Sequence, residues 1–329
     1  MRLLTVGVND GGQRLDKFLA KATVGMPKSL LYKYIRQKCV KVNGKKAEPS
    51  QMLAVGDEIK LFISDEFFPD TAKNAAIVSV KPKLTVVYED DNIIICDKPV
   101  GVLVHSGDAD GEASDDKNTL IGHIQAYLYG RGEYDPKLEN TFAPALCNRI
   151  DRNTRGLVIA AKNAAALREM NLIIKERFIK KLYLCAVHGR PHPTSATLNG
   201  YLRREGNGGV CVYDKNVPGS KPIVTKYKCL QTVGEAESML SLCEIELVTG
   251  RTHQIRAHME HAGWPLLGEG RYGKNLADRS KGYRSQALCA YKIVFCLDGY
   301  DGELAYLNGK SVSIDLKTVD FMREFKNAK

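Results

Sequence analysis

One carboxylate in this chain stands among arginines. Asp151 lies in the segment N-R-I-D-R-N-T-R-G, which also contains Arg149, Arg152 and Arg155. Neighbouring guanidinium groups favour the ionised form of an aspartate, which suits a nucleophile or a stabiliser of positive charge better than a general acid. Ion-pair networks on surface hairpins gather the same residue types. The segment alone therefore leaves a catalytic and a merely structural interpretation open.

Two apolar runs flank this segment and would position it. Residues 143–147 precede it, and residues 157–161 follow the turn residue Gly156. Short apolar runs separated by turn residues predict two strands joined by a tight loop. Loops carried by a rigid scaffold often hold binding and catalytic groups.

Two other patterns suggest chemistry, and both are rejected. His253, His258 and His261 lie close together, but they lack the H-E-x-x-H spacing and no cysteine or acidic cluster completes a metal site. Residues 268–273 match G-x-G-x-x-G. They follow no clear buried strand and lead into a polar loop instead of a helix, which argues against dinucleotide binding and an oxidoreductase.

The composition is that of an ordinary globular protein. The chain has 329 residues, of which 44% are hydrophobic and 26% charged, enough for one large core and a small second domain. No apolar run approaches the ~20 residues that span a bilayer, and the N-terminus lacks a signal-peptide core. Nine cysteines without a C-x-x-C pair predict reduced thiols. We expect a cytoplasmic protein that does not contact a membrane.

Positive charge is concentrated near the N-terminus. The whole chain carries +10, and residues 1–64 hold twelve lysines and arginines against five acids, a net +7. A basic module on a nearly neutral body indicates a polyanion-binding appendage. A basic surface that only maintains solubility is the alternative.

Residues 14–63 predict a compact unit of two helices and a basic hairpin. Apolar residues recur at helical spacing over residues 14–22 and 27–38, and Asn43-Gly44 is typical of a hairpin turn. Cations of this unit could hold the backbone phosphates of a nucleic acid. The candidate RNA-binding residues are Lys17, Lys28, Lys33, Arg36, Lys41 and Lys45.

This unit resembles the S4-type RNA-binding domain. The matching segments are R-L-D-K-F-L (14–19), K-S-L-L-Y-K-Y-I-R (28–36), V-K-V-N-G-K (40–45) and V-G-D-E-I (55–59). The resemblance implies RNA as the ligand but no reaction. We divide the chain into an S4-type domain (residues 1–64), a linker (65–83) and a catalytic domain (84–329).

Six ordered motifs within residues 84–300 resemble the RluA-type pseudouridine synthases. They are I-C-D-K-P-V-G-V-L-V-H (95–105), N-R-I-D-R-N-T-R-G-L-V-I-A-A-K (148–162), K-K-L-Y-L-C-A-V-H-G (180–189), E-L-V-T-G-R-T-H-Q-I-R-A-H (246–258), G-W-P-L-L-G-E-G-R-Y-G (263–273) and A-L-C-A-Y-K-I-V-F (287–295).

The resemblance implies an α+β fold with a mixed, mainly antiparallel curved central sheet, flanking helices and a central cleft. It also implies a reaction, the isomerisation of uridine in RNA to pseudouridine. No redox change occurs, so neither a cofactor nor a metal is expected. An S4-type domain is common in the branch that acts on large-subunit ribosomal RNA. The expected partner is therefore ribosomal RNA or a precursor of the large ribosomal subunit, bound by a monomer.

The resemblance also implies roles for individual residues. Asp151 matches the catalytic aspartate, which attacks the sugar or stabilises its cationic transition state; a ribosyl ester and a glycal route both stay open. Arg251 matches the arginine that ion-pairs with this aspartate. Tyr183 matches the tyrosine beside the target base. Arg149 matches the arginine that fills the space left by the extruded nucleotide, and extrusion is required because a stacked helix hides C1′ and C5.

Three positions depart from the usual family pattern. Asn148 stands in place of His, Asn153 in place of Asp and Arg155 in place of Ser. We expect Asn148 to alter the grip on the RNA backbone and Arg155 to add a cation beside the active loop. None of the three removes Asp151, so an active enzyme is expected. The alternative is a non-catalytic RNA-binding or ribosome-assembly factor that kept the cleft.

Overall fold

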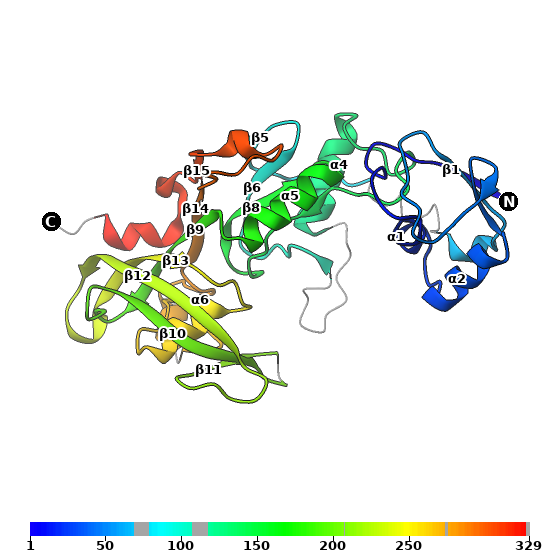
Figure 1. Cartoon of the computed structure of the whole chain (residues 1–329). Helices are drawn as coiled ribbons and strands as arrows, with labels where there is room; N and C mark the ends of the chain where they lie inside the picture. Colours follow the sequence, from blue (N-terminus) through cyan, green and yellow to red (C-terminus); the bar gives the residue numbers. More distant parts are fainter. Residues whose placement is uncertain (69–78, 107–117, 207, 274–275, 327–329) are drawn as a thin grey trace.

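The chain forms two units with separate sheets (Figure 1). The computed structural model describes residues 1–68, 79–106, 118–206, 208–273 and 276–326. Part of the expected linker, residues 69–78, lies outside the described residues. The domain boundaries at residues 64 and 84 therefore stay a prediction.

The N-terminal unit is a four-stranded antiparallel sheet with two helices. The strand order is β1-β4-β2-β3. Its elements are β1 (Arg2–Thr5), α1 (Leu15–Ala22), α2 (Lys28–Arg36), β2 (Val40–Val42), β3 (Lys45–Lys46) and β4 (Glu58–Leu61), followed by the 3₁₀ helix η1 (Asp65–Phe67). The apolar positions that predicted the helices are buried in one core with the strands, for example Leu15, Phe18, Leu31 and Ile35.

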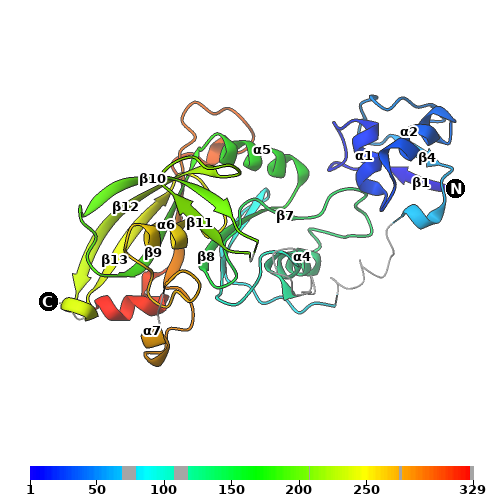
Figure 2. The same ribbon diagram turned by 90° about the horizontal axis from the view of Figure 1, so that it is seen from below.

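The second unit is built on an eleven-stranded sheet. The strand order is β11-β10-β12-β13-β9-β14-β8-β6-β5, with β7 beside β8 and β15 beside β14. The strands are β5 (Val86–Glu89), β6 (Ile93–Lys98), β7 (Ala145–Leu146), β8 (Arg155–Ala161), β9 (Ile179–His188), β10 (Ser195–Arg204), β11 (Val210–Tyr213), β12 (Lys221–Val233), β13 (Leu240–Leu247), β14 (Leu288–Phe295) and β15 (Ser311–Ser313). Only β8 and β14 pair in parallel among these strands. The expected α+β class with a mixed, mainly antiparallel curved sheet (Figure 2) is confirmed.

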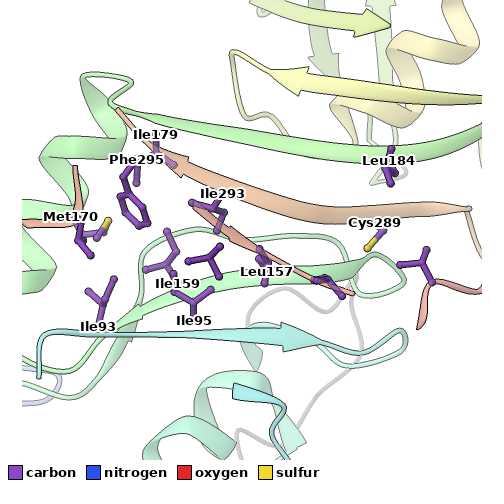
Figure 3. Close-up of a cluster of buried hydrophobic side chains, with 14 of the residues drawn as sticks. Ile93, Ile95, Leu157, Ile159, Met170, Ile179, Leu184, Cys289, Ile293 and Phe295 are labelled. Carbon is purple, nitrogen blue, oxygen red and sulfur yellow. The ribbon is translucent and has the colours of Figure 1, made fainter. Parts of the chain in front are cut away.

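Helices cover both faces of this sheet. The α-helices are α4 (Leu120–Gly130), α5 (Ala164–Lys175), α6 (Gln254–His261) and α7 (Leu276–Ser280), and the 3₁₀ helices are η4 (Ala236–Ser238), η5 (Ala305–Leu307), η6 (Leu316–Thr318) and η7 (Asp320–Phe325). Successive residues of a strand point to opposite faces. Accordingly, Ile93 and Ile95 of β6 join the core that includes Met170 of α5 (Figure 3), whereas Ile94 and Cys96 join the core beneath α4 and α6.

The segment around Asp151 is the loop between β7 and β8, as its flanking apolar runs predicted. β8 lies between β6 and β14 in the interior of the sheet. At Gly156 the backbone has a φ of +140°, and a Cβ there would lie 2.5 Å from the carbonyl oxygen of Ala290. Glycine is therefore required where β8 leaves the loop and meets β14.

Replacing Gly156 with alanine should destabilise the protein, because the added methyl group collides with the backbone of β14. We expect Gly156→Ala to lower the free energy of unfolding in urea by about 1–3 kcal/mol, the usual cost of overpacking. Gly130→Ala at the end of α4 is the control, since its Cβ would meet nothing within 4 Å. Equal stability of the two variants would contradict this account.

Candidate active site

A cavity of about 270 Å³ lies against the Asp151 loop, β9 and the start of α6. It brings together all four residues that the sequence placed at the reaction centre. Its lining includes Arg149, Asp151, Lys181, Tyr183, Arg251, His253 and Arg256. These residues come from three separate stretches of the chain, so the cavity exists only in the folded protein.

Arg256 is the arginine that pairs with Asp151. Its Nη1 donates to Oδ2 of Asp151 at 3.2 Å. The expectation that Arg251 makes this ion pair is wrong: Arg251 is exposed in the turn before α6, where its backbone N–H donates to the side chain of Gln254. Because α6 begins at Gln254, Arg256 lies within the helix, on the side that faces the Asp151 loop.

Glu269 holds Arg256 from the other side. The guanidinium donates from Nε to Oε2 of Glu269 at 2.7 Å and from Nη2 to Oε1 at 2.8 Å. The backbone N–H of Arg271 donates to the same carboxylate at 2.8 Å, and that carboxylate has no exposed surface. Sequence reasoning missed both residues, although each stands inside a motif quoted for the family resemblance.

The charges of Asp151, Arg256 and Glu269 stabilise one another. Burial by itself would lower the pKa of Arg256, but the hydrogen bonds and charge of Glu269, and then those of Asp151, raise it above its usual range. Burial would raise the pKa of Glu269, but the contacts with Arg256 and the backbone N–H groups lower it. Arg256 is thus a fixed cation whose planar fork orients the carboxylate of Asp151.

His253 lies between Asp151 and Tyr272. Its Nδ1 is 2.7 Å from the Tyr272 hydroxyl, and its Nε2 is 3.8 Å from Oδ2 of Asp151. The residue has a φ of +55°, in the left-handed region. Backbone strain of this kind is often found at functional sites.

Gln254 anchors the turn that carries Arg251 and His253. Its Oε1 accepts from the Thr249 hydroxyl at 2.9 Å, and its Nε2 donates to the Thr225 hydroxyl at 3.0 Å. Thr225 also contacts Nδ1 of His258 at 3.0 Å, and burial lowers the pKa of His258 to about 4. His258 is therefore a neutral residue of the core, and it helps to fix the turn through Thr225.

Tyr183 and Lys181 project from one face of β9 and line the cavity. Tyr183 is buried, and burial together with the charge of Asp151 raises the pKa of its hydroxyl, so the phenol is neutral. Burial lowers the pKa of Lys181. Sequence reasoning missed Lys181, although its position two residues before Tyr183 places both on the same face of a strand.

Lys98 ties a neighbouring turn to the Asp151 loop. This side chain is fully buried, and its Nζ donates to the carbonyl groups of Pro99, Val102 and Arg152 at 2.8–2.9 Å. Burial lowers the pKa of Lys98 to about 8, against the opposing effect of the Asp151 and Asp97 carboxylates. Three backbone acceptors thus fix the position of one ammonium group.

Two of the three departures from the family pattern have structural roles. The Oδ1 of Asn148 accepts from the backbone N–H of Ile159 at 2.7 Å, which braces the loop against β8. Arg155 donates to Asp97 from Nη2 at 2.7 Å and from the same nitrogen to the Thr318 hydroxyl. The cation expected beside the active loop is therefore engaged in an ion pair. Asn153 is exposed.

The candidate RNA-binding cations lie on the N-terminal unit, away from the cavity. Lys17, Lys28, Lys33, Arg36 and Lys45 are exposed, and Lys41 is half-buried. Over the described ranges, no group of three or more His, Cys, Asp and Glu side chains could hold a metal ion. No helix in that part of the chain is long and apolar enough to cross a bilayer.

Comparisons with known proteins agree on one family. Residues 92–261 match the model of the family described as RNA pseudouridylate synthase, and residues 13–59 match the S4 domain. An uncharacterized RNA pseudouridine synthase of Mycoplasma genitalium is 33% identical, over 86% of this chain and 85% of the relative. The ribosomal large subunit pseudouridine synthase C of Escherichia coli is 32% identical, over 85% and 82%.

A solved structure shows the same fold. The human RNA pseudouridylate synthase domain containing 4 superposes with a TM-score of 0.54 at 16% identity, covering 78% of this chain and 96% of that one. At this identity the likeness supports the architecture alone.

Glu269→Gln should remove a pH-dependent part of the stability. Because folding lowers the pKa of Glu269 from its usual 4.5, its contribution is present above that value and is lost as the pH falls through the folded pKa. We expect the variant to be less stable by about 3 kcal/mol at pH 7, with the difference narrowing below about pH 4. Urea unfolding of both proteins at a series of pH values measures this difference in stability.

The matched control is Glu176→Gln, which removes a carboxylate whose side chain is 49% exposed. It should unfold like the wild type at every pH. A stability gap for Glu269→Gln that does not change with pH would contradict the charge assigned to this carboxylate.

Proposed function

This chain belongs to the RNA pseudouridylate synthase family, and we propose that it isomerises uridines of large-subunit ribosomal RNA in the cavity around Asp151. It is an RNA pseudouridine synthase with an S4 domain that binds RNA. One observation carries the proposal that the reaction takes place in this cavity. Arg256 forms ion pairs with both Asp151 and Glu269, and Tyr183 lines the same cavity. The ribosomal large subunit pseudouridine synthase C of Escherichia coli supports the choice of RNA.

The reaction exchanges one glycosidic bond for another. The N1–C1′ bond breaks, N1 takes the electron pair, and positive charge develops at C1′. Asp151 either bonds to C1′ or accepts a proton from C2′; both routes use the ionised carboxylate that Arg256 orients. The base then turns and C5 bonds to C1′, while the Asp151–C1′ bond breaks on the first route or Asp151 returns the proton to C2′ on the second. The C5 proton is lost and N1 gains a proton, so the product is an isomer of the substrate.

Other cavity residues can hold the extruded nucleotide. The neutral ring of Tyr183 can stack on the base. Arg149 is exposed beside Asp151, where it can occupy the space that the nucleotide leaves in the RNA. Arg251 does not pair with Asp151. Its side chain is exposed at the cavity, where it can bind a backbone phosphate of the RNA.

The N-terminal cations would hold a second part of the same RNA. Lys17, Lys28, Lys33, Arg36, Lys41 and Lys45 form this proposed binding set, and phosphate contacts of this kind position an RNA without reading its sequence. We further propose that the enzyme acts as a monomer in the cytoplasm. Its nine cysteines are free thiols, as is usual in the reducing cytoplasm.

Tritium release from RNA labelled at uridine C5 tests the reaction. With unmodified large-subunit ribosomal RNA, the wild type should release tritium. Asp151→Asn should be slower by more than about a thousandfold, because the group that acts at C1′ is lost. Asn153→Asp, in the same loop, should stay active. Failure of the wild type on ribosomal, transfer and total RNA would favour the non-catalytic RNA-binding factor.

Arg256 and Arg251 should affect the reaction differently. Arg256→Gln frees Asp151 from its partner, and we expect kcat to fall by about a hundredfold. Arg251→Gln should raise KM and leave kcat nearly unchanged, because a phosphate contact is the same in ground and transition states. The same labelled RNA measures both constants. A lower kcat for Arg251→Gln together with a higher KM for Arg256→Gln would instead indicate that Arg251 pairs with Asp151.

The N-terminal cations should set the salt dependence of binding. We expect Lys33→Gln combined with Arg36→Gln to reduce the slope of log affinity against log salt by roughly 1.5, about 0.7–0.9 for each lost phosphate contact. Lys175→Gln, exposed on α5, is the control. An unchanged slope in the double variant would remove these two residues from the RNA-binding set.

A further inference from the structure

The N-terminal unit is docked on the second unit through polar side chains. In both views the chain that precedes β7 reaches the N-terminal unit beside α1 (Figures 1 and 2). We call the contacting residues the docking interface. They are Thr5, Asn9, Asp10 and Gln13 on one side and Glu139, Asn140, Thr141 and Ala164 on the other.

Asp10 is the centre of the docking interface. It has no exposed surface, yet none of the described lysines or arginines forms an ion pair with it. Instead, Nδ2 of Asn140 donates to Oδ2 at 2.7 Å, and the hydroxyl of Thr141 donates to Oδ1. A buried carboxylate is costly unless donors surround it. The second unit supplies two of these donors, so the docked position is specific.

Asn9 makes a second contact from the same turn. Its Nδ2 donates to Oε1 of Glu139 at 2.7 Å, and its Oδ1 accepts from the backbone N–H of Ala164 at 2.9 Å. The first N–H groups of a helix have no partner within that helix. Asn9 therefore helps to cap α5 from the other unit, beside the cap that Asn163 provides through the N–H of Ala166.

The docking interface holds both ends of the hairpin that carries Asp151. Residues 139–141 lie shortly before β7, and Ala164 follows β8 after two residues. No described apolar cluster contains residues from both units. Hydrogen bonds of the docking interface, not a shared core, therefore set the position of the N-terminal unit relative to the cavity.

We propose that the docking interface determines specificity by fixing the span between the N-terminal RNA-binding face and the Asp151 cavity. The ligand it selects is a structured RNA that can reach both sites at that span. Two linked sites strengthen binding only when the ligand fits their separation. This inference rests on the proposed function, because it needs RNA on both surfaces.

The test removes donors to Asp10 in the full chain. The variant Asn140→Ala/Thr141→Val lacks both, whereas Thr141→Ser keeps the hydroxyl and is the matched control. Each protein is assayed for tritium release on unmodified large-subunit ribosomal RNA and on a short hairpin that carries one target uridine and is too small to reach the N-terminal unit. Pseudouridines are then mapped along the long RNA.

We expect the double variant to lose about tenfold or more in kcat/KM on ribosomal RNA and to modify additional uridines there. On the short hairpin it should match the wild type, and Thr141→Ser should match the wild type on both RNAs. Small-angle X-ray scattering should show a larger radius of gyration for the double variant alone.

Three results would overturn the inference. One is an unchanged map and kcat/KM on ribosomal RNA. Another is an equal loss on both RNAs, which would assign the docking interface to the stability of the cavity. The third is an unchanged radius of gyration. Release of no tritium by the wild type from either RNA would instead overturn the proposed function, and this inference with it.

Discussion

The candidate active site depends on one buried cation, Arg256, which contacts two carboxylates. Arg256 donates a forked pair of hydrogen bonds to Glu269, and its remaining nitrogen donates to Asp151. Removing one partner of a buried ion pair leaves the other charge uncompensated, which costs far more than the pair contributes. The helix, the Glu269 segment and the Asp151 loop are therefore bound to one another by charge, and each keeps the position that the others require.

The sheet makes this arrangement rigid. β6 and β8 are buried on both faces, so the strand that follows the Asp151 loop has little freedom to move. Lys98 donates to the carbonyl of Arg152 within the loop, and Asn148 of the loop accepts from the N–H of Ile159 in β8. Catalytic geometry needs such support, because small displacements of a reacting group cost much of its effect.

The two units are joined by a different kind of interaction. Each has its own apolar core, and the described contacts between them are hydrogen bonds around Asn9 and Asp10. Polar interfaces within a chain resemble transient complexes and separate more readily than cores. The N-terminal unit therefore keeps its position relative to the cavity only while these directional hydrogen bonds are made.

The family resemblance, and not local spacing, placed Asp151 and Tyr183 at one site. Local patterns in the sequence determined the strands around Asp151 and the helices of the N-terminal unit. These features depend on neighbours in the chain, so spacing reveals them. Only the tertiary structure decided that Arg256 and not Arg251 faces Asp151, because the choice depends on where α6 begins. It also paired Glu269 with Arg256 and Arg155 with Asp97. Residues so far apart in sequence come into contact only when the sheet and its helices pack. Local sequence patterns therefore cannot predict these contacts.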